Sequence, residues 1–87
     1  MGIELLCLSL ILYHEARGEP RVGQLAVAEV VLNRVIDGRY PNTVCDVMEQ
    51  ERNGVCHFSF WCDGLSNTPE NKELWEEVQF TASQMFY

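Results

Sequence analysis

Hydrophobic residues follow helical spacing along most of the chain. Residues 2–17 are almost continuously apolar, with Glu4 as the single charge before His14. This composition predicts a helix that is buried on most of its sides. Residues 21–37 alternate apolar and polar side chains at helical spacing, and Pro20 suits the start of a helix. The first half of the chain is therefore predicted to be a pair of helices joined by a short turn.

The second half carries shorter and more varied patterns. Residues 44–50 are expected to form a short helix, and the aromatic-rich residues 55–62 alternate in a way that predicts an extended segment. The Asp-Gly pair at 63–64 indicates a turn. A last helix is expected to open at Pro69, with Thr68 as its N-cap, and to continue to the end of the chain.

These elements predict an α+β fold that is mainly α, in one domain covering residues 1–87. The formal net charge of −7 argues against nucleic acid as a partner, because a nucleic-acid-binding surface needs clustered Lys and Arg. The six cationic residues are scattered along the chain. The same negative charge argues against adhesion to anionic membrane surfaces.

The apolar N-terminal run resembles a signal peptide only superficially. It lacks a basic first segment, contains Glu4, and continues into His14 and Glu15 without a small-residue cleavage site. It is also too short for a membrane span. We therefore expect a buried helix and no span, and the localisation stays unknown. A phage-encoded protein and a protein whose leader has been removed both fit.

The four cysteines are an even number in a small chain, which permits disulfides. Cys7 lies on the apolar helix and is expected to be a buried thiol. Cys45, Cys56 and Cys62 lie in polar sequence, where one bridge between some pair of them is expected. The thiols and His57 lack the spacing of a zinc site, so no metal site is predicted.

One carboxylate has an unusual position. Glu15 lies in the last turn of the apolar helix, just before Gly18 and Pro20 end it. The negative end of a helix dipole disfavours an ionised carboxylate, and desolvation by aromatic neighbours would do the same. A carboxylic acid that keeps its proton near neutral pH is what general-acid catalysis requires. Glu15 is therefore the candidate catalytic residue.

Five ordered blocks resemble the spore-cortex-lytic enzyme type of cell-wall hydrolase. They are YHEARGEP at 13–20, GQLAVA at 23–28, VLNRV at 31–35, YPNTVC at 40–45 and CHFSFWCDG at 56–64. The resemblance implies a small lysozyme-like domain that cleaves peptidoglycan between N-acetylmuramic acid and N-acetylglucosamine. It also implies that Glu15 is the catalytic acid, and that no cofactor is needed.

The resemblance leaves the outcome of the reaction open. Lytic transglycosylase and muramidase activities both remain, as does a catalytically silent module that only binds or assembles on peptidoglycan. Because family domains continue beyond the last block with a segment that helps to form the cleft, we expect this domain to be incomplete at its C-terminus. Self-association, or completion by the missing segment, would then supply the rest of the groove.

Further candidates for substrate contact surround Glu15 in the motifs. They are Tyr13, Glu19, Gln24, Ser59, Phe60, Trp61 and Asp63. All except Ser59 have a structural alternative: an ion pair or helix cap for Glu19, a cap for Gln24, core packing for the aromatic residues, and a turn for Asp63. His14 is favoured as a structural residue, because neighbouring helix positions point about 100° apart.

Overall fold

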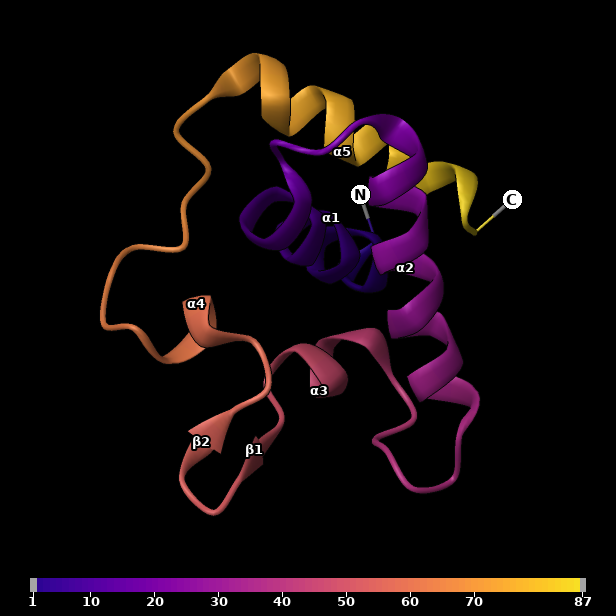
Figure 1. Cartoon of the computed structure of the whole chain (residues 1–87), viewed down its shortest axis with the longest axis vertical. Helices are drawn as coiled ribbons and strands as arrows, with labels where there is room; N and C mark the ends of the chain where they lie inside the picture. The colour runs from indigo at the N-terminus through magenta and orange to yellow at the C-terminus, as the bar shows by residue number, and fades with distance from the viewer. Residues whose placement is uncertain (1, 87) are drawn as a thin grey trace.

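The computed structural model describes residues 2–86 and arranges them around one central helix. Figure 1 shows α1 (Ile3–Ala16) in the middle of the molecule. It packs against α2 (Arg21–Ile36), α3 (Val44–Met48) and α5 (Lys72–Gln84). The predicted α+β class, mainly α, is confirmed. The last expected helical residue, Tyr87, lies outside the described residues.

Helix α1 is enclosed because its side chains are apolar on several faces. Leu8, Ile11 and Leu12 are completely buried. Glu4 is the one charged residue in the apolar part of this helix. Its carboxylate accepts a hydrogen bond from the backbone N–H of Val44 at the start of α3. A carboxylate at that position satisfies one of the free N–H groups at a helix N-terminus. Glu4 therefore joins α1 to α3.

A buried amide joins α1, α2 and α5. Gln24 is completely buried, and its Nε2 donates to the carbonyls of Ala16 and Glu19 at 3.5 and 3.4 Å. Its Oε1 accepts from the Thr81 hydroxyl of α5 at 3.1 Å. Buried polar groups cost free energy unless they are paired, and here each atom of the amide has a partner. Gln24 thus links the turn between α1 and α2 to α5 through hydrogen bonds.

The segment expected to be extended changes conformation halfway. Strands β1 (Glu51–Arg52) and β2 (Val55–Cys56) form an antiparallel hairpin, and α4 (Ser59–Cys62) follows directly. The prediction of an extended segment over 55–62 is therefore wrong for its second half. A disulfide joins Cys56 to Cys62, with their Cα atoms 6.2 Å apart. Six extended residues would separate these atoms by about 20 Å, so the bond requires the chain to turn.

The turns of this region follow the local sequence. Asn53 and Gly54 have φ of 55° and 78°, which is the conformation that an Asn-Gly hairpin turn requires. The predicted turn at Asp63 and Gly64 is also present, with Gly64 at φ 76° and the Asp63 carboxylate accepting from the Leu65 N–H at 2.8 Å.

Helix α5 begins later than the sequence predicts. Thr68 and Pro69 were expected to open it, but Lys72 is its first residue and Asn71 is its N-cap. The Asn71 side chain accepts from the Leu74 N–H at 3.0 Å. Residues 63–71, here called the linker, stay non-helical because α1 holds their last amides by hydrogen bonds from a distant part of the chain.

The second disulfide corrects the expectation for Cys7. This residue is buried, as expected, but it is bonded to Cys45 rather than free. The bond ties α1 to α3 next to the Glu4 contact. Residue spacing gave no signal for this pair, because the two cysteines are 38 positions apart and meet only through packing. Within residues 2–86, no helix is long and apolar enough to cross a membrane.

The two disulfides should contribute unequally to stability. A cross-link restricts the unfolded chain more when it closes a longer loop. Removing the Cys7–Cys45 bond, which spans 38 positions, should lower the free energy of unfolding by about 4 kcal/mol. Removing the Cys56–Cys62 bond, which spans 6 positions, should cost about 2 kcal/mol. Urea unfolding of the two double-alanine variants measures both, and an equal or reversed order would contradict this explanation.

The Gln24 amide should be essential to the packing of α2 on α5. Gln24→Ala leaves the Thr81 hydroxyl without its partner on α2 and two carbonyls without a donor, so unfolding should become easier by about 3 kcal/mol. Thr81→Val removes one of these hydrogen bonds and should cost about 1 kcal/mol. Denaturant titration compares the variants, and a Gln24→Ala loss no larger than that of Thr81→Val would show that the amide is dispensable.

Candidate functional site

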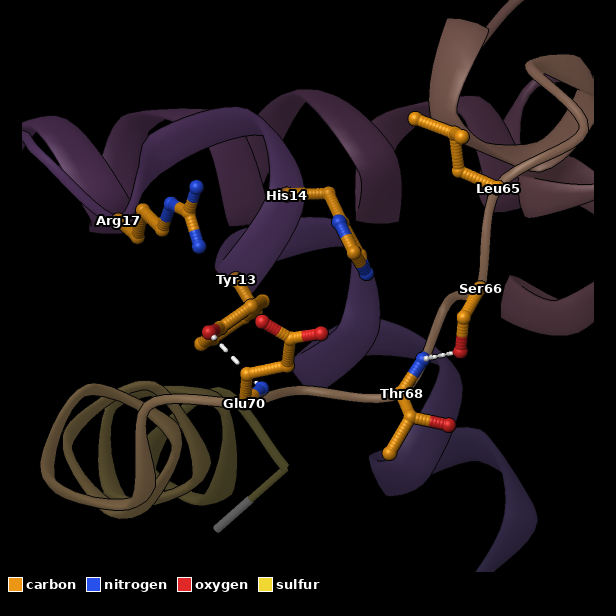
Figure 2. Close-up of a pocket in the computed structure, with 7 residues that line it drawn as sticks. All are labelled: Tyr13, His14, Arg17, Leu65, Ser66, Thr68 and Glu70. Carbon is orange, nitrogen blue, oxygen red and sulfur yellow. Dashed lines mark hydrogen bonds between the residues drawn. The ribbon is translucent and has the colours of Figure 1, made fainter.

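A cavity of about 390 Å³ lies beside the C-terminal turn of α1. Figure 2 shows the side chains that line this α1 cavity, which come from α1 on one side and from the linker on the other. They are Tyr13, His14, Arg17, Leu65, Ser66, Thr68 and Glu70. The lining combines rings, hydroxyls and opposite charges, which can form hydrogen bonds and ion pairs with a polar ligand.

Tyr13 holds the end of the linker against α1. Its hydroxyl oxygen accepts from the backbone N–H groups of Glu70 and Asn71 at 3.2 and 2.9 Å. The hydrogen bond from Asn71 is the main reason that the pKa of Tyr13 is lowered. The guanidinium of Arg17 lies over the Tyr13 ring, 5.0 Å from its centre, and also lowers the pKa. The predicted sugar-contact residue thus also acts as a structural anchor.

His14 holds the middle of the linker. Its Nε2 lies 3.0 Å from the carbonyl oxygen of Asn67. Because a carbonyl only accepts, Nε2 must carry a proton. The imidazole also stacks on Phe60 of α4, with ring centres 4.4 Å apart and planes 12° apart. His14 therefore connects α1 with both α4 and the linker, which agrees with its expected structural role.

The α1 cavity contains a carboxylate that the sequence did not single out. Glu70 is the one acidic residue among the described side chains that line it. Figure 2 shows its carboxylate pointing from the linker toward α1, with Arg17 on the helix. The sequence offered only a weak signal, an acidic residue directly after Pro69. Its position in the cavity depends on the contacts of Tyr13 and His14, which hold the linker against α1.

Glu15 does not line this cavity, although its neighbours Tyr13, His14 and Arg17 do. Its side chain is exposed, so the expected desolvation by aromatic neighbours is not found. Glu15 follows Ile11 by four residues and Leu12 by three, and both of these are completely buried. Residues three and four apart share one face of a helix. Glu15 therefore lies where the buried face of α1 reaches the surface.

Three of the other candidates occupy turns or the interior. Gln24 is completely buried and its amide is fully engaged, so we do not place it among the sugar contacts. Glu19 is exposed and folds over Gly23 in the first turn of α2, where an added Cβ would come within 3.0 Å of the Glu19 Cβ. Asp63 uses its carboxylate in the turn before Leu65.

The remaining candidates belong to α4. Phe60 is buried and offers a face to His14, whereas Ser59 and Trp61 are exposed. The structure therefore brings Tyr13, His14 and Phe60 together, and leaves Ser59 and Trp61 at the surface beside them.

Metal-binding donors converge at the hairpin. Among the described residues, Glu51, Cys56 and Cys62 place three potential ligand atoms within 4.8 Å of one another. His57, which the sequence considered as a zinc ligand, instead packs its ring edge-on to Tyr40, with centres 6.4 Å apart. The sulfur atoms of the group are joined in the Cys56–Cys62 disulfide.

Sequence comparison relates the chain to several spore cortex-lytic enzymes. The spore cortex-lytic enzyme of Bacillus cereus is 55% identical over 40 residues, which are 46% of this chain and 15% of that protein. The enzyme of the same name from Bacillus subtilis strain 168 is 49% identical over 41 residues, 47% of this chain and 13% of the relative. The spore cortex-lytic enzyme of Halalkalibacterium halodurans is 56% identical over 36 residues, which are 41% of this chain and 11% of that protein.

The matched stretches are thus a small part of each relative's length. No solved structure matches the chain. A family model described as Cell Wall Hydrolase matches residues 18–86, which include α2 to α5 and the linker and begin after Glu15. Because this match extends over well more than half of the sequence, the chain belongs to the Cell Wall Hydrolase family.

Proposed function

We propose that this chain is the glycan-cleaving part of a peptidoglycan-lytic enzyme, with Glu15 as the general acid and base. Its family and the names of its relatives support action on the cell wall. The observation that carries the proposal is the position of Glu15. It is exposed on the last turn of a buried helix, and its helix neighbours Tyr13, His14 and Arg17 line a cavity of polar and aromatic groups.

The proposed reaction needs one carboxyl group. Glu15 donates its proton to the glycosidic oxygen between N-acetylmuramic acid and N-acetylglucosamine, and the bond breaks through an oxocarbenium-like state. The N-acetyl group of the substrate stabilises the developing positive charge. The Glu15 carboxylate then accepts a proton from the muramic C6 hydroxyl, which closes a 1,6-anhydro ring. If it instead accepts a proton from water, the product is a reducing end.

The α1 cavity would bind a part of the strand next to the bond that breaks. Glu70 can accept hydrogen bonds from sugar hydroxyls, and Arg17 can pair with the free carboxylates of the peptides that peptidoglycan carries. The net charge of −7 gives no general attraction to anionic wall polymers. Affinity would therefore come from these local contacts and from stacking on exposed aromatic rings such as Trp61.

A second function is favoured by one observation. Glu15 is exposed and lies outside the α1 cavity, so the cavity has the composition of a sugar-binding site without containing the proposed acid. The alternative is a module that binds peptidoglycan and does not cleave it. In that case the wild-type chain would sediment with purified sacculi and release no soluble fragments.

Glu15→Gln should abolish turnover while leaving the fold intact. Loss of general acid–base catalysis should reduce the rate by about 10²- to 10⁴-fold. Soluble fragments released from purified sacculi give the rate, and their masses distinguish anhydro ends from reducing ends. Glu29→Gln, which neutralises an exposed carboxylate on α2, is the matched control and should keep full activity.

The same assay on Glu70→Gln separates the two acidic residues. This variant should weaken substrate binding, seen as a higher KM, with little change in kcat. Full activity of Glu15→Gln, with circular dichroism unchanged, would refute Glu15 as the acid. Loss of kcat in Glu70→Gln alone would transfer that role to the carboxylate in the cavity.

Tyr13→Phe should release the end of the linker from α1. Without the hydroxyl, the amides of Glu70 and Asn71 lose their acceptor, which should cost about 1 kcal/mol because water partly replaces it. Hydrogen exchange at these two amides should become faster, and sugar binding in the α1 cavity weaker. Tyr40→Phe removes a hydroxyl from the loop after α2 and serves as the control. Equal exchange at both amides in the two variants would exclude the anchor.

A further inference from the structure

Three potential metal-ligand atoms lie close together where the hairpin faces α4. The Oε1 atom of Glu51, on β1, lies 3.6 Å from the sulfur of Cys56 on β2 and 3.6 Å from the sulfur of Cys62 at the end of α4. All three ligand atoms lie within 4.8 Å of one another. Figure 1 shows these elements together at one end of the molecule, away from α5.

The oxidised pair gives this carboxylate no hydrogen-bond donor. A carboxylate oxygen only accepts, and the sulfurs of a disulfide carry no hydrogen. The contact becomes favourable in two other states of the same atoms. Two thiols would each donate to Oε1, and two thiolates with the carboxylate would share a cation. The position of Glu51 therefore suits the reduced pair better than the oxidised one.

We propose that the Cys56–Cys62 disulfide is reducible and that its reduced form binds Zn²⁺ through the two sulfurs and Glu51. Zinc takes sulfur at about 2.3 Å and carboxylate oxygen at about 2.1 Å in tetrahedral geometry, which separates these donors by about 3.6 Å. Both sulfur–oxygen distances here are 3.6 Å. Reduction frees the sulfurs to move apart to their own tetrahedral spacing, and water takes the fourth position.

The chemical steps balance with a dithiol as the reductant. The dithiol supplies two electrons and two protons and becomes a cyclic disulfide, while the Cys56–Cys62 bond breaks to give two thiols. Zinc binding then displaces the two thiol protons to solvent, because the ligands are thiolates. The zinc-bound form carries the same link between β2 and α4 as the disulfide does.

Exposure makes this bond the one that reacts first. Cys62 is exposed and Cys56 is half-buried, whereas in the other disulfide Cys45 is half-buried and Cys7 is only 4% exposed and packs in the core. Accessible disulfides are the labile ones. Helix α4 also carries Phe60, which stacks on His14, a residue that lines the α1 cavity. Whether the link between Cys56 and Cys62 is kept therefore affects how α4 supports that wall of the cavity. The link would thus be kept in both oxidising and reducing surroundings.

The order of reduction is tested on the wild-type chain. After brief treatment with dithiothreitol and alkylation, peptide mass spectrometry should find Cys56 and Cys62 labelled before Cys7 and Cys45. Native mass spectrometry of the reduced protein with zinc should then show one bound ion and the loss of two protons. Labelling of Cys7 and Cys45 first, or no bound ion, would overturn the proposal.

Cobalt identifies the ligands. Reduced protein freed of dithiothreitol and titrated with Co²⁺ should develop a thiolate-to-metal charge-transfer band that zinc abolishes. The band should be absent in the Cys56→Ser/Cys62→Ser variant. Glu51→Gln should weaken binding by at least about 10-fold, whereas Glu49→Gln, at an exposed carboxylate two positions earlier in the chain, should not. An unchanged band in the double-serine variant would refute the site.

Discussion

The burial of α1 is the constraint on which the rest of this structure depends. A helix that is apolar on several faces cannot remain in water, and α2, α3 and α5 enclose it from different directions. One of the two disulfides and one side-chain hydrogen bond also reach α1, through Cys7 to Cys45 and through Glu4 to the first amide of α3. The C-terminal turn of α1 is consequently held in a fixed position, with Tyr13 and Ala16 buried and Glu15 exposed.

That fixed turn determines the shape of the candidate site. The linker has no regular backbone pairing of its own, and two neighbouring side chains of α1 replace it. His14 reaches the carbonyl of Asn67, and the Tyr13 hydroxyl receives the amides of Glu70 and Asn71. The space between these anchors is the α1 cavity. Its far wall is therefore only as stable as two side-chain contacts, and regions with few such contacts open most easily.

Local sequence signals predicted the parts of the fold that local physics decides. Periodicity identified the α1 and α2 helices, and the Asp63-Gly64 turn has the conformation that its residues favour. The failures involve distant partners. Thr68 was a reasonable cap by itself, but Tyr13 kept the chain extended as far as Asn71. Likewise, α4 replaces an extended strand because the Cys56–Cys62 bond brings its ends together.

The candidate site divides in the same way. The motif around Glu15 could be recognised because its residues are contiguous, and most of the α1 side of the cavity comes from that motif. Glu70, Ser66 and Thr68 could not be recognised, since their approach to α1 depends on where the linker is anchored. Gln24 was expected to contact a sugar or to cap a helix, whereas its burial and its bond to Thr81 depend on the packing of α5, which no local pattern contains.

Helix geometry defines how a glycan strand would have to meet Glu15 and the cavity. Tyr13 and Arg17 are four residues apart and share one face of α1, the face that lines the cavity. Glu15 is two residues from each, which turns its side chain about 200° away from Tyr13. A strand that contacts both must therefore cross the end of α1 rather than run along it. In the proposed reaction, the α1 cavity then binds a neighbouring unit of the strand, while the bond that breaks lies beyond the helix end at Glu15.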